Sequence, residues 1–446
     1  MLATVLGGLV LAATAMAVDV DVYHHFEHHD FFSMRMMGDD GAFRWNTYSA
    51  VQEFAMDAGG EVLISGVSAT HPISFSLYTY EQWDVYRSLV FQITSMAAYD
   101  ETMALTCMYP AAARISFDPK RSNASATIRI PITVASQYTL QIESCLPAYN
   151  LVQAKVVMRN VAYDGSVTEH LGVDQLGLLP VYSIVTAAFV LMTTLWGIDC
   201  LRKERPTYAI HGVFGLCLVV RTFECFIKLW HYHVLSKSGR TRSFLSVGKD
   251  MCEHMTTTVL LLFLLLSYPL NGLSSLHVRM LFVFLNHSSE RRIVQACFVL
   301  YVFVAMTKAT CDSRNQVCQG YMLTEYVLKS LMLLGIIITL NYSIAQLQTK
   351  LESDHGRWNE SKIPKMQVRL NLYLSLRYSF LAYLLLPTAV LMINLGVINP
   401  PGTWRYVWAT YLFEEVVMGC IFTHLALVLR PVHPMTLELL TQKKAT

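Results

Sequence analysis

Seven long apolar runs fill the chain from about residue 177 onward. They cover approximately 177–200, 207–231, 248–269, 291–309, 319–341, 371–395 and 404–428. Each run is long enough to cross the hydrocarbon core of a bilayer, which needs about 20 mostly apolar residues in a helix. Because a lipid-exposed segment must satisfy its backbone groups internally, the pattern predicts an all-α bundle of seven membrane helices over residues 176–430.

The composition supports a membrane protein with the lipid bilayer as its surroundings, and it excludes two other classes. Hydrophobic residues make up 54% of the 446 residues and charged residues only 15%, against about 25% charged in soluble domains. An ordinary soluble enzyme is therefore excluded. The net charge is +2, without the basic surplus of a nucleic-acid binder, so no nucleic-acid partner is expected.

The first residues predict entry into the secretory pathway. Residues 1–17 are apolar and end in Ala15-Met16-Ala17, which fits a signal-peptide cleavage site. The stretch lacks an initial Lys or Arg, so an uncleaved anchor is the alternative. Either way the next segment faces the lumen or the cell exterior. Lys and Arg are about twice as frequent in the loops that this orientation places in the cytosol, which agrees with the positive-inside rule. The tail at 431–446 is then cytosolic.

Residues 18–175 contain no run long enough to span a membrane. Short segments rich in β-branched and aromatic residues alternate there with turn signals, at 61–65, 73–80, 126–134, 138–143 and 154–160. This spacing predicts a lumenal all-β sandwich of about 150 residues.

The expected lumenal chemistry is a disulfide and a glycan. Cys107 and Cys145 are the only cysteines of the predicted sandwich, and two thiols in an oxidising compartment most simply pair; two buried free thiols are the alternative. Asn123 starts the only lumenal acceptor for N-glycosylation. One further loop disulfide can form among three cysteines near the lumenal ends of the third and fifth spans, Cys252, Cys311 and Cys318.

A histidine-rich segment, Tyr23-His-His-Phe-Glu-His-His-Asp30, follows the signal. In a strand, His25, Glu27 and His29 share one face and have side chains that can bind a transition metal. The alternative is a solvated or pH-sensitive segment, because histidine titrates near the pH of acidic compartments. We expect no cofactor, and these three residues are the metal candidates.

Ionisable residues inside the predicted spans are the candidate site. Each costs about 2.5–3.5 kcal/mol at mid-helix and needs a partner or water. The set is Arg221, Glu224, Lys228, Glu253, Glu325, Lys329 and Glu414. They map to the lumenal half or the midplane, where they line a ligand cavity or form an internal ion-pair network that fixes helix packing. Glu414 and its neighbour Glu415 lie about 100° apart on a helix and cannot both face inward.

Several short segments carry a family resemblance. They are Leu77-Tyr-Thr-Tyr-Glu-Gln-Trp-Asp-Val-Tyr86, Glu169-His-Leu-Gly-Val-Asp-Gln-Leu-Gly-Leu-Leu-Pro-Val-Tyr182, Leu229-Trp-His-Tyr-His233 and Leu427-Val-Leu-Arg-Pro431. They resemble the GOLD-domain seven-transmembrane proteins, which include the lung seven-transmembrane receptors, the intimal-thickness-related receptor and Wntless. The resemblance implies a GOLD-like lumenal sandwich on a bundle like that of rhodopsin and other G-protein-coupled receptors. It also implies receptor signalling, or cargo sorting through the Golgi and endosomes.

The expected function is that of a multi-pass receptor of the Golgi, endosome or plasma membrane. It would sense a lumenal protein or small-molecule ligand and signal to cytosolic partners, or, as the alternative, sort cargo with trafficking proteins and no G protein. The third span lacks the acidic-Arg-aromatic triplet of rhodopsin-type receptors. A channel or transporter is less favoured because no inverted repeat is evident. The absence of zinc and nucleophile motifs argues against an enzyme.

The predicted topology can be checked by glycosylation. Asn123→Gln should remove the mass of one N-glycan on a denaturing gel, because Asn123-Ala-Ser125 is the lumenal acceptor. Asn286→Gln, which alters an acceptor on the cytosolic side, should change nothing. Resistance of the glycan to endoglycosidase H then reports passage through the Golgi. A glycan on Asn286 would contradict the orientation.

Overall fold

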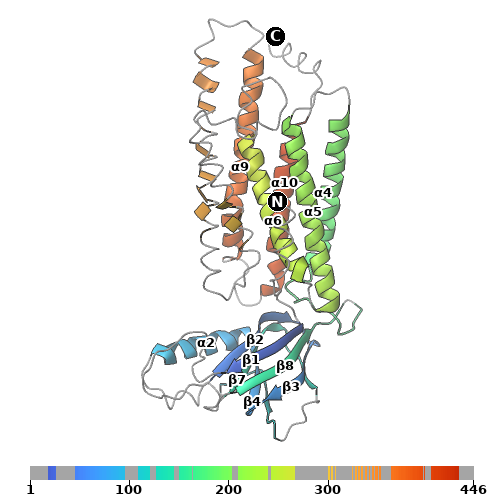
Figure 1. The fold of residues 1–446 in the computed structure, drawn as a ribbon, viewed down its shortest axis with the longest axis vertical. Helices are drawn as coiled ribbons and strands as arrows, with labels where there is room; N and C mark the ends of the chain where they lie inside the picture. Colours follow the sequence, from blue (N-terminus) through green and yellow to red (C-terminus); the bar gives the residue numbers. More distant parts are fainter. Residues whose placement is uncertain are drawn as a thin grey trace.

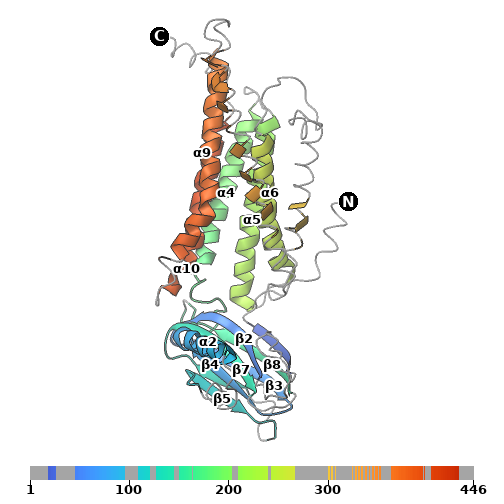
Figure 2. The same ribbon diagram turned by 90° about the vertical axis from the view of Figure 1, so that its left-hand side faces the viewer.

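The computed structural model places a β-domain at one end of a bundle of long helices (Figures 1 and 2). The structure describes residues 19–26, 46–95, 109–120, 127–144, 150–162, 164–202, 209–239, 243–266, 363–394, 396 and 403–430, with scattered residues between 300 and 352. The predicted fold class, antiparallel β-strands followed by a helical membrane region, is confirmed. The predicted signal peptide and cytosolic tail lie outside the described residues.

The β-domain consists of two four-stranded antiparallel sheets. The first has the order β1 (Asp19–Phe26), β8 (Asn150–Arg159), β3 (Glu61–Ala69) and β6 (Ile128–Pro131). The second has the order β2 (Asn46–Met56), β7 (Ser136–Ser144), β4 (Ile73–Thr79) and β5 (Ala113–Phe117). The five segments predicted as strands all fall within these sheets or overlap them.

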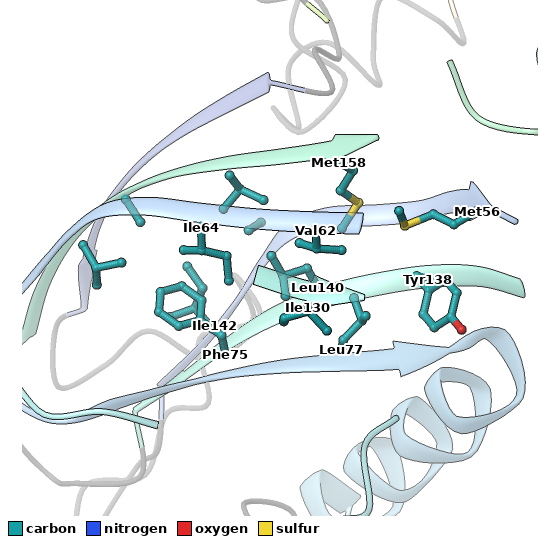
Figure 3. Packing of buried hydrophobic residues seen from close by; sticks show 14 of the residues in the cluster. Met56, Val62, Ile64, Phe75, Leu77, Ile130, Tyr138, Leu140, Ile142 and Met158 are labelled. Carbon is teal, nitrogen blue, oxygen red and sulfur yellow. The ribbon is translucent and has the colours of Figure 1, made fainter. Parts of the chain in front are cut away.

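The core of the sandwich follows from the alternation of side chains along its strands. Phe75 and Leu77 on β4 point to the same side as Leu140 and Ile142 on β7, and they meet Ile64 of β3 from the opposite sheet (Figure 3). All five are almost completely buried. Successive strand residues face opposite sides, so an apolar residue at every second position yields one dry face per sheet. Burial of these faces stabilises the domain.

Helix α2 (Tyr80–Ser95) covers the outer face of the second sheet and was not predicted. The strand predicted at 73–80 ends at Thr79, and the helix starts at once with Tyr80. Thr79 and Gln82 cap that helix reciprocally: the Gln82 N–H donates to Thr79 Oγ1 at 3.4 Å, and the Thr79 N–H donates to Gln82 Oε1 at 3.1 Å. This capping box satisfies backbone donors that a helix start leaves unpaired.

A buried polar cluster lies on the sheet face that α2 covers. Glu143 accepts hydrogen bonds from Tyr78 at 2.6 Å and from Ser76 at 2.8 Å, and Arg114 pairs with it at 3.2 Å. Burial raises the pKa of Glu143, and these partners offset part of the rise. The ring of Tyr86 on α2 stacks on Tyr78 with centroids 4.9 Å apart. The cluster therefore ties α2 to the sheet.

The helical region contains α4 (Leu178–Leu201), α5 (Ala209–Ser238), α6 (Ser243–Leu266), α9 (Ile363–Ile393) and α10 (Val407–Val428), the last preceded by a 3-10 turn, η3 (Trp404–Tyr406). Among the described residues, four helical segments are long and apolar enough to cross a membrane: Leu178–Leu201, Ile210–Ser238, Leu370–Ile393 and Trp404–Val428. Helix α6 is as long as α4 but carries Lys249, Asp250 and Glu253 in its first half. The scattered residues described between 300 and 352 are all helical.

Helix α5 is longer than the apolar run that predicted it. The run ends at 231, whereas the helix continues to Ser238. Leu235 is only 5% exposed and belongs to the core cluster of the sandwich, and Tyr232 packs against that cluster. The extra turns are therefore held by the β-domain. The predicted domain boundary at 175–176 falls in the linker between β8 and α4.

Candidate functional site

The candidate site starts from three charged residues on one face of α5. Arg221, Glu224 and Lys228 are spaced by three and four residues, which places neighbouring side chains above one another on a helix. Arg221 Nη1 donates to Glu224 Oε1 at 2.6 Å, and Lys228 Nζ lies 2.7 Å from the same oxygen. One carboxylate thus bridges two cations within a single helix.

Two further helices contribute carboxylates to the site. Glu415 of α10 accepts a hydrogen bond from Arg221 Nη2, and its Oε1 lies 3.9 Å from Lys228 Nζ. Glu253 of α6 pairs with Lys228 at 3.2 Å. We call Arg221, Glu224, Lys228, Glu253 and Glu415 the charge network. It connects α5, α6 and α10 through side chains alone.

Helix α4 supplies an aromatic wall to the charge network. The Arg221 guanidinium carbon lies 5.5 Å from the centre of the Phe189 ring, and Lys228 Nζ lies 5.9 Å from the centre of the Tyr182 ring. The two rings are seven residues apart and share one helix face, which suits cation–π contact with both cations. Glu224 is fully buried and Arg221 is 4% exposed, so these charges depend on one another for solvation.

The structure brings together four of the seven predicted site residues: Arg221, Glu224, Lys228 and Glu253. Glu415, which the predicted set did not include, is the residue of α10 that pairs with Arg221. Glu414 is exposed, whereas Glu415 is 4% exposed and shares the inner face of α10 with Met418 and Phe422. Since adjacent helix residues point about 100° apart, only one of the two can reach Arg221. The remaining pair, Glu325 and Lys329, lies outside the described residues.

Most of the charge network agrees with the interpretation of an internal ion-pair network. Arg221, Glu224, Lys228 and Glu415 are all buried and paired. Glu253 is different, because 54% of its side chain is exposed. The network therefore has a closed part around Arg221 and an accessible edge on α6.

The linker between the β-domain and α4 is hydrogen-bonded to both parts of the molecule. The His170 N–H donates to Ser236 O at 3.3 Å, and Ser236 Oγ donates to Glu169 Oε2 at 2.9 Å, which joins the linker to α5. Gly239 follows α5 with a φ of 67°, and a Cβ there would meet the His170 ring at 2.7 Å. A glycine at this helix end therefore permits the close approach.

The same linker contacts β2 and α10. The Val173 N–H donates to Ala55 O at 3.0 Å, and the Trp408 N–H donates to Asp174 O at 3.1 Å. Asn160, which is fully buried, donates from Nδ2 to Ala55 O at 3.0 Å. These are mostly backbone bonds, which fix the path of the linker. We call the linker 160–177 together with its contacts on β2, α5 and α10 the junction.

A stacked pair of tyrosines connects the junction to the charge network. Tyr182 of α4 and Tyr232 of α5 have ring centres 5.5 Å apart and an interplanar angle of 7°. Tyr232 packs against the core of the sandwich, while the Tyr182 ring lies beside Lys228. A continuous series of contacts therefore runs from the β-domain core to the buried charges. Tyr182 and Tyr232 both lie in segments that carry the family resemblance, but nothing in the sequence predicted this contact.

Several predicted features lie outside the described residues and stay predictions. They are the disulfide partners Cys107 and Cys145, the acceptor Asn123, the metal candidates Glu27 and His29, and Cys311 and Cys318. His25 lies on β1, whose side chains are not described. Cys252 is a buried free thiol on α6, so it forms none of the expected loop disulfides. Within the described ranges, no group of three or more His, Cys, Asp or Glu side chains could hold a metal ion.

Comparison with known proteins gives a family match over the helical region. The model of the family described as GOST, seven transmembrane domain, matches residues 177–434, more than half of the chain and all of the charge network. Among solved structures, the chain is similar to xanthorhodopsin, described as a light-driven ion pump with dual chromophore, at 14% identity and a TM-score of 0.31. That alignment covers 61% of this chain and 96% of xanthorhodopsin. No curated protein gives a significant match.

The junction should be more stable in acid than at neutral pH. Asp174 is 8% exposed, and burial raises its pKa from 3.8 to about 6. A raised pKa means that the packed junction prefers the protonated carboxyl, so its stabilisation is lost as the pH rises through about 6. Between pH 5 and pH 7 the equilibrium should shift about tenfold toward the open junction.

Thermal unfolding and limited proteolysis at pH 5, 6 and 7 test this shift. Asp174→Asn, which cannot ionise, should remove the pH dependence and keep the low-pH stability. Tyr232 of α5 and Tyr411 of α10 are titratable groups within electrostatic range of Asp174. An unchanged pH profile in Asp174→Asn would assign the dependence to another group.

Removal of the central cation should destabilise the bundle strongly. Arg221→Met leaves Glu415 and part of Glu224 without their cation in a buried setting, which costs about 3–5 kcal/mol. Arg87→Met is the matched control, because Arg87 and its partner Asp84 are both more than half exposed and such pairs contribute about 0–1 kcal/mol. Unfolding in detergent measures both variants. Equal losses would show that the charge network does not hold the helices.

Proposed function

Because the chain belongs to the GOST seven-transmembrane family, we propose that it is a membrane receptor whose β-domain binds a lumenal or extracellular partner and whose bundle signals to cytosolic proteins. One observation carries this proposal. Helix α5 belongs to the core of the β-domain at one end and to the charge network of the bundle further along. A partner that moves the β-domain therefore acts directly on the buried charges.

Helix α5 is well suited to transmit such a movement. Its 30 residues span about 45 Å at 1.5 Å per residue. Leu235 sits in the sandwich core at one end, and Phe214 packs edge-on against Trp196 of α4 near the other, with ring centres 4.8 Å apart. The charge network lies between these two contacts. A continuous helix transfers a tilt at one end to the other without a hinge.

Helix α10 forms a second connection of the same kind. Arg405, in the turn before it, pairs with Asp57 at the end of β2. Glu415 enters the charge network, and Arg430 after the helix pairs with Asp199 of α4 at 3.1 Å. The β-domain thus contacts the start of α10 and the end of α5. A movement of the domain changes their relative position.

The charge network provides the element that can adopt two arrangements, which a signalling device requires. Arg221 binds Glu224 within α5 and Glu415 across to α10. If α10 shifts, Arg221 keeps its bond to Glu224, and Glu415 exchanges Arg221 for Lys228, whose Nζ already lies 3.9 Å from Glu415 Oε1. The guanidinium and the Glu415 carboxylate then each keep a partner of opposite charge, so the shift leaves no buried charge unpaired.

The proposal is tested by cutting the apolar contact between α5 and the sandwich. Leu235→Ala should destabilise the docked state by about 2–5 kcal/mol, as for other buried leucines. Leu216→Ala is the matched control, because it makes the same change on the same helix at a residue that is 51% exposed. A proximity-labelling enzyme fused to the C-terminus of the full chain should label a changed set of cytosolic proteins in Leu235→Ala and an unchanged set in Leu216→Ala.

The outcomes separate the receptor from the sorting adaptor. If Leu235→Ala changes the set of labelled cytosolic proteins while the protein stays in its normal compartment, the result supports signalling. If Leu235→Ala displaces the protein from its normal compartment and lumenal cargo is retained, the result supports sorting. If proteolysis shows that the β-domain is released in Leu235→Ala while label and location both stay as in the wild type, the proposed coupling is refuted.

A further inference from the structure

Two atoms of the charge network are buried without a hydrogen-bond partner. Arg221 Nη1 donates to Glu224 Oε1 at 2.6 Å and Nη2 donates to Glu415, but Arg221 Nε makes no hydrogen bond in the part of the chain that the structure describes. The second oxygen of Glu224, Oε2, is likewise unpaired there. Arg221 is 4% exposed and Glu224 is fully buried. Such atoms cost free energy until a polar partner reaches them.

The two unpaired atoms select the chemistry of their partner. Nε is a donor on a cation and Oε2 is an acceptor on an anion, and the 2.6 Å bond between Arg221 and Glu224 keeps these side chains together. A cation near Oε2 would be repelled by Arg221 and by Lys228, whose Nζ lies 2.7 Å from the other oxygen of Glu224. An anion near Nε would be repelled by Glu224 and Glu415, which pair with the same guanidinium. The site therefore suits small neutral molecules that both donate and accept hydrogen bonds.

A third unpaired atom continues the site along the inner face of α5. His231, Lys228, Glu224 and Arg221 are separated by three, four and three residues, so they form one line about 15 Å long on the helix. His231 is 6% exposed, and its Nδ1 has no hydrogen-bond partner among the described residues. The line therefore carries unpaired polar atoms at its outer end and at its inner end.

Helix α4 faces this line with an unpaired hydroxyl. Thr186 is 8% exposed, and its Oγ1 also lacks a hydrogen-bond partner within the described ranges. It follows Tyr182 by four residues and precedes Phe189 by three, so it shares their helix face. The ring of Tyr182 lies 5.9 Å from Lys228 Nζ, and the ring of Phe189 lies 5.5 Å from the guanidinium carbon of Arg221. Thr186 is therefore at a level between these two cations.

We propose that the inner faces of α4 and α5 bind internal water molecules, held at Arg221 Nε and Glu224 Oε2 and continued toward Thr186 and His231. A buried water molecule typically makes about three hydrogen bonds to polar groups that otherwise lack partners. Such water completes the solvation of the charge network, which the ion pairs alone leave incomplete. The inference goes beyond the proposed function and does not depend on it.

Radiolytic footprinting of the full chain in nanodiscs tests the proposal. A short X-ray pulse converts water into hydroxyl radicals, which oxidise the side chains next to the water from which they form. Phe189 is only 2% exposed, but its ring lies against Arg221, so it should be oxidised in spite of its burial. Phe214 is the matched control, because it is fully buried and packs edge-on against Trp196 in the apolar core. We expect Phe189 to react several-fold faster than Phe214.

A matched pair of substitutions tests the hydroxyl on α4. Thr186→Val removes the hydroxyl and keeps the shape of the side chain. If water binds the hydroxyl, losing that bond lowers the thermal unfolding midpoint; if the hydroxyl has no partner, removing a buried unpaired polar atom raises it. Thr194→Val makes the same change on the same helix at an exposed residue, whose hydroxyl donates to Val190 O at 2.8 Å. We expect the midpoint to fall in Thr186→Val and to stay nearly unchanged in Thr194→Val.

The inference is overturned if Phe189 and Phe214 are oxidised at equal rates, because the space beside Arg221 would then be as dry as the apolar core. If Phe189 reacts faster but Thr186→Val raises the midpoint, water is confirmed at Arg221 and Glu224 and its continuation to Thr186 is refuted. None of these results bears on the labelling experiment with Leu235→Ala, so the water site and the proposed signalling can fail separately.

Discussion

The pairing of Arg221 with two carboxylates is the constraint on which the rest of the bundle depends. A buried guanidinium cannot be left alone in a membrane, and in this structure Glu224 and Glu415 both pair with Arg221. Since Glu415 is on α10, this requirement sets how α5 and α10 are rotated toward each other. Phe189 of α4 and, through Lys228, Glu253 of α6 then follow. The apolar contacts around Phe214, Leu376 and Phe422 fill the space that these charges define.

The β-domain and the bundle are joined by two kinds of contact that respond differently to force. Leu235 and Tyr232 enter the sandwich core, where burial is non-directional and tolerates small shifts. The bonds from Val173 to Ala55 and from Trp408 to Asp174 are backbone bonds, which are directional and break over small displacements. The apolar contact between α5 and the sandwich therefore tolerates a small shift of the β-domain, whereas the backbone hydrogen bonds of the linker resist it.

The sequence predicted the parts of the site that depend on local spacing. Arg221, Glu224 and Lys228 follow from helix periodicity, and the membrane helices follow from their apolar length. Glu415 could not be chosen over Glu414, because the choice depends on the rotation of α10 about its axis, which packing against Met418 and Phe422 sets. Helix α2 had a signal in the capping pair Thr79 and Gln82, but the aromatic residues around it also favour a strand. The last turns of α5 are too polar to read as membrane helix.

The excess length of α5 makes a single helix part of both the sandwich core and the bundle. A helix that stopped with its apolar run at 231 would lack Leu235, and the β-domain would be held by the linker 160–177 and the start of α10 alone. The continuation to Ser238 buries Leu235 in the sandwich, so the helix that holds the charge network is also a member of the other core. Tyr182 and Tyr232 stack where the two cores meet, between the last apolar contact and the first charge. A continuous series of contacts through two aromatic rings therefore joins the core of the β-domain to Lys228.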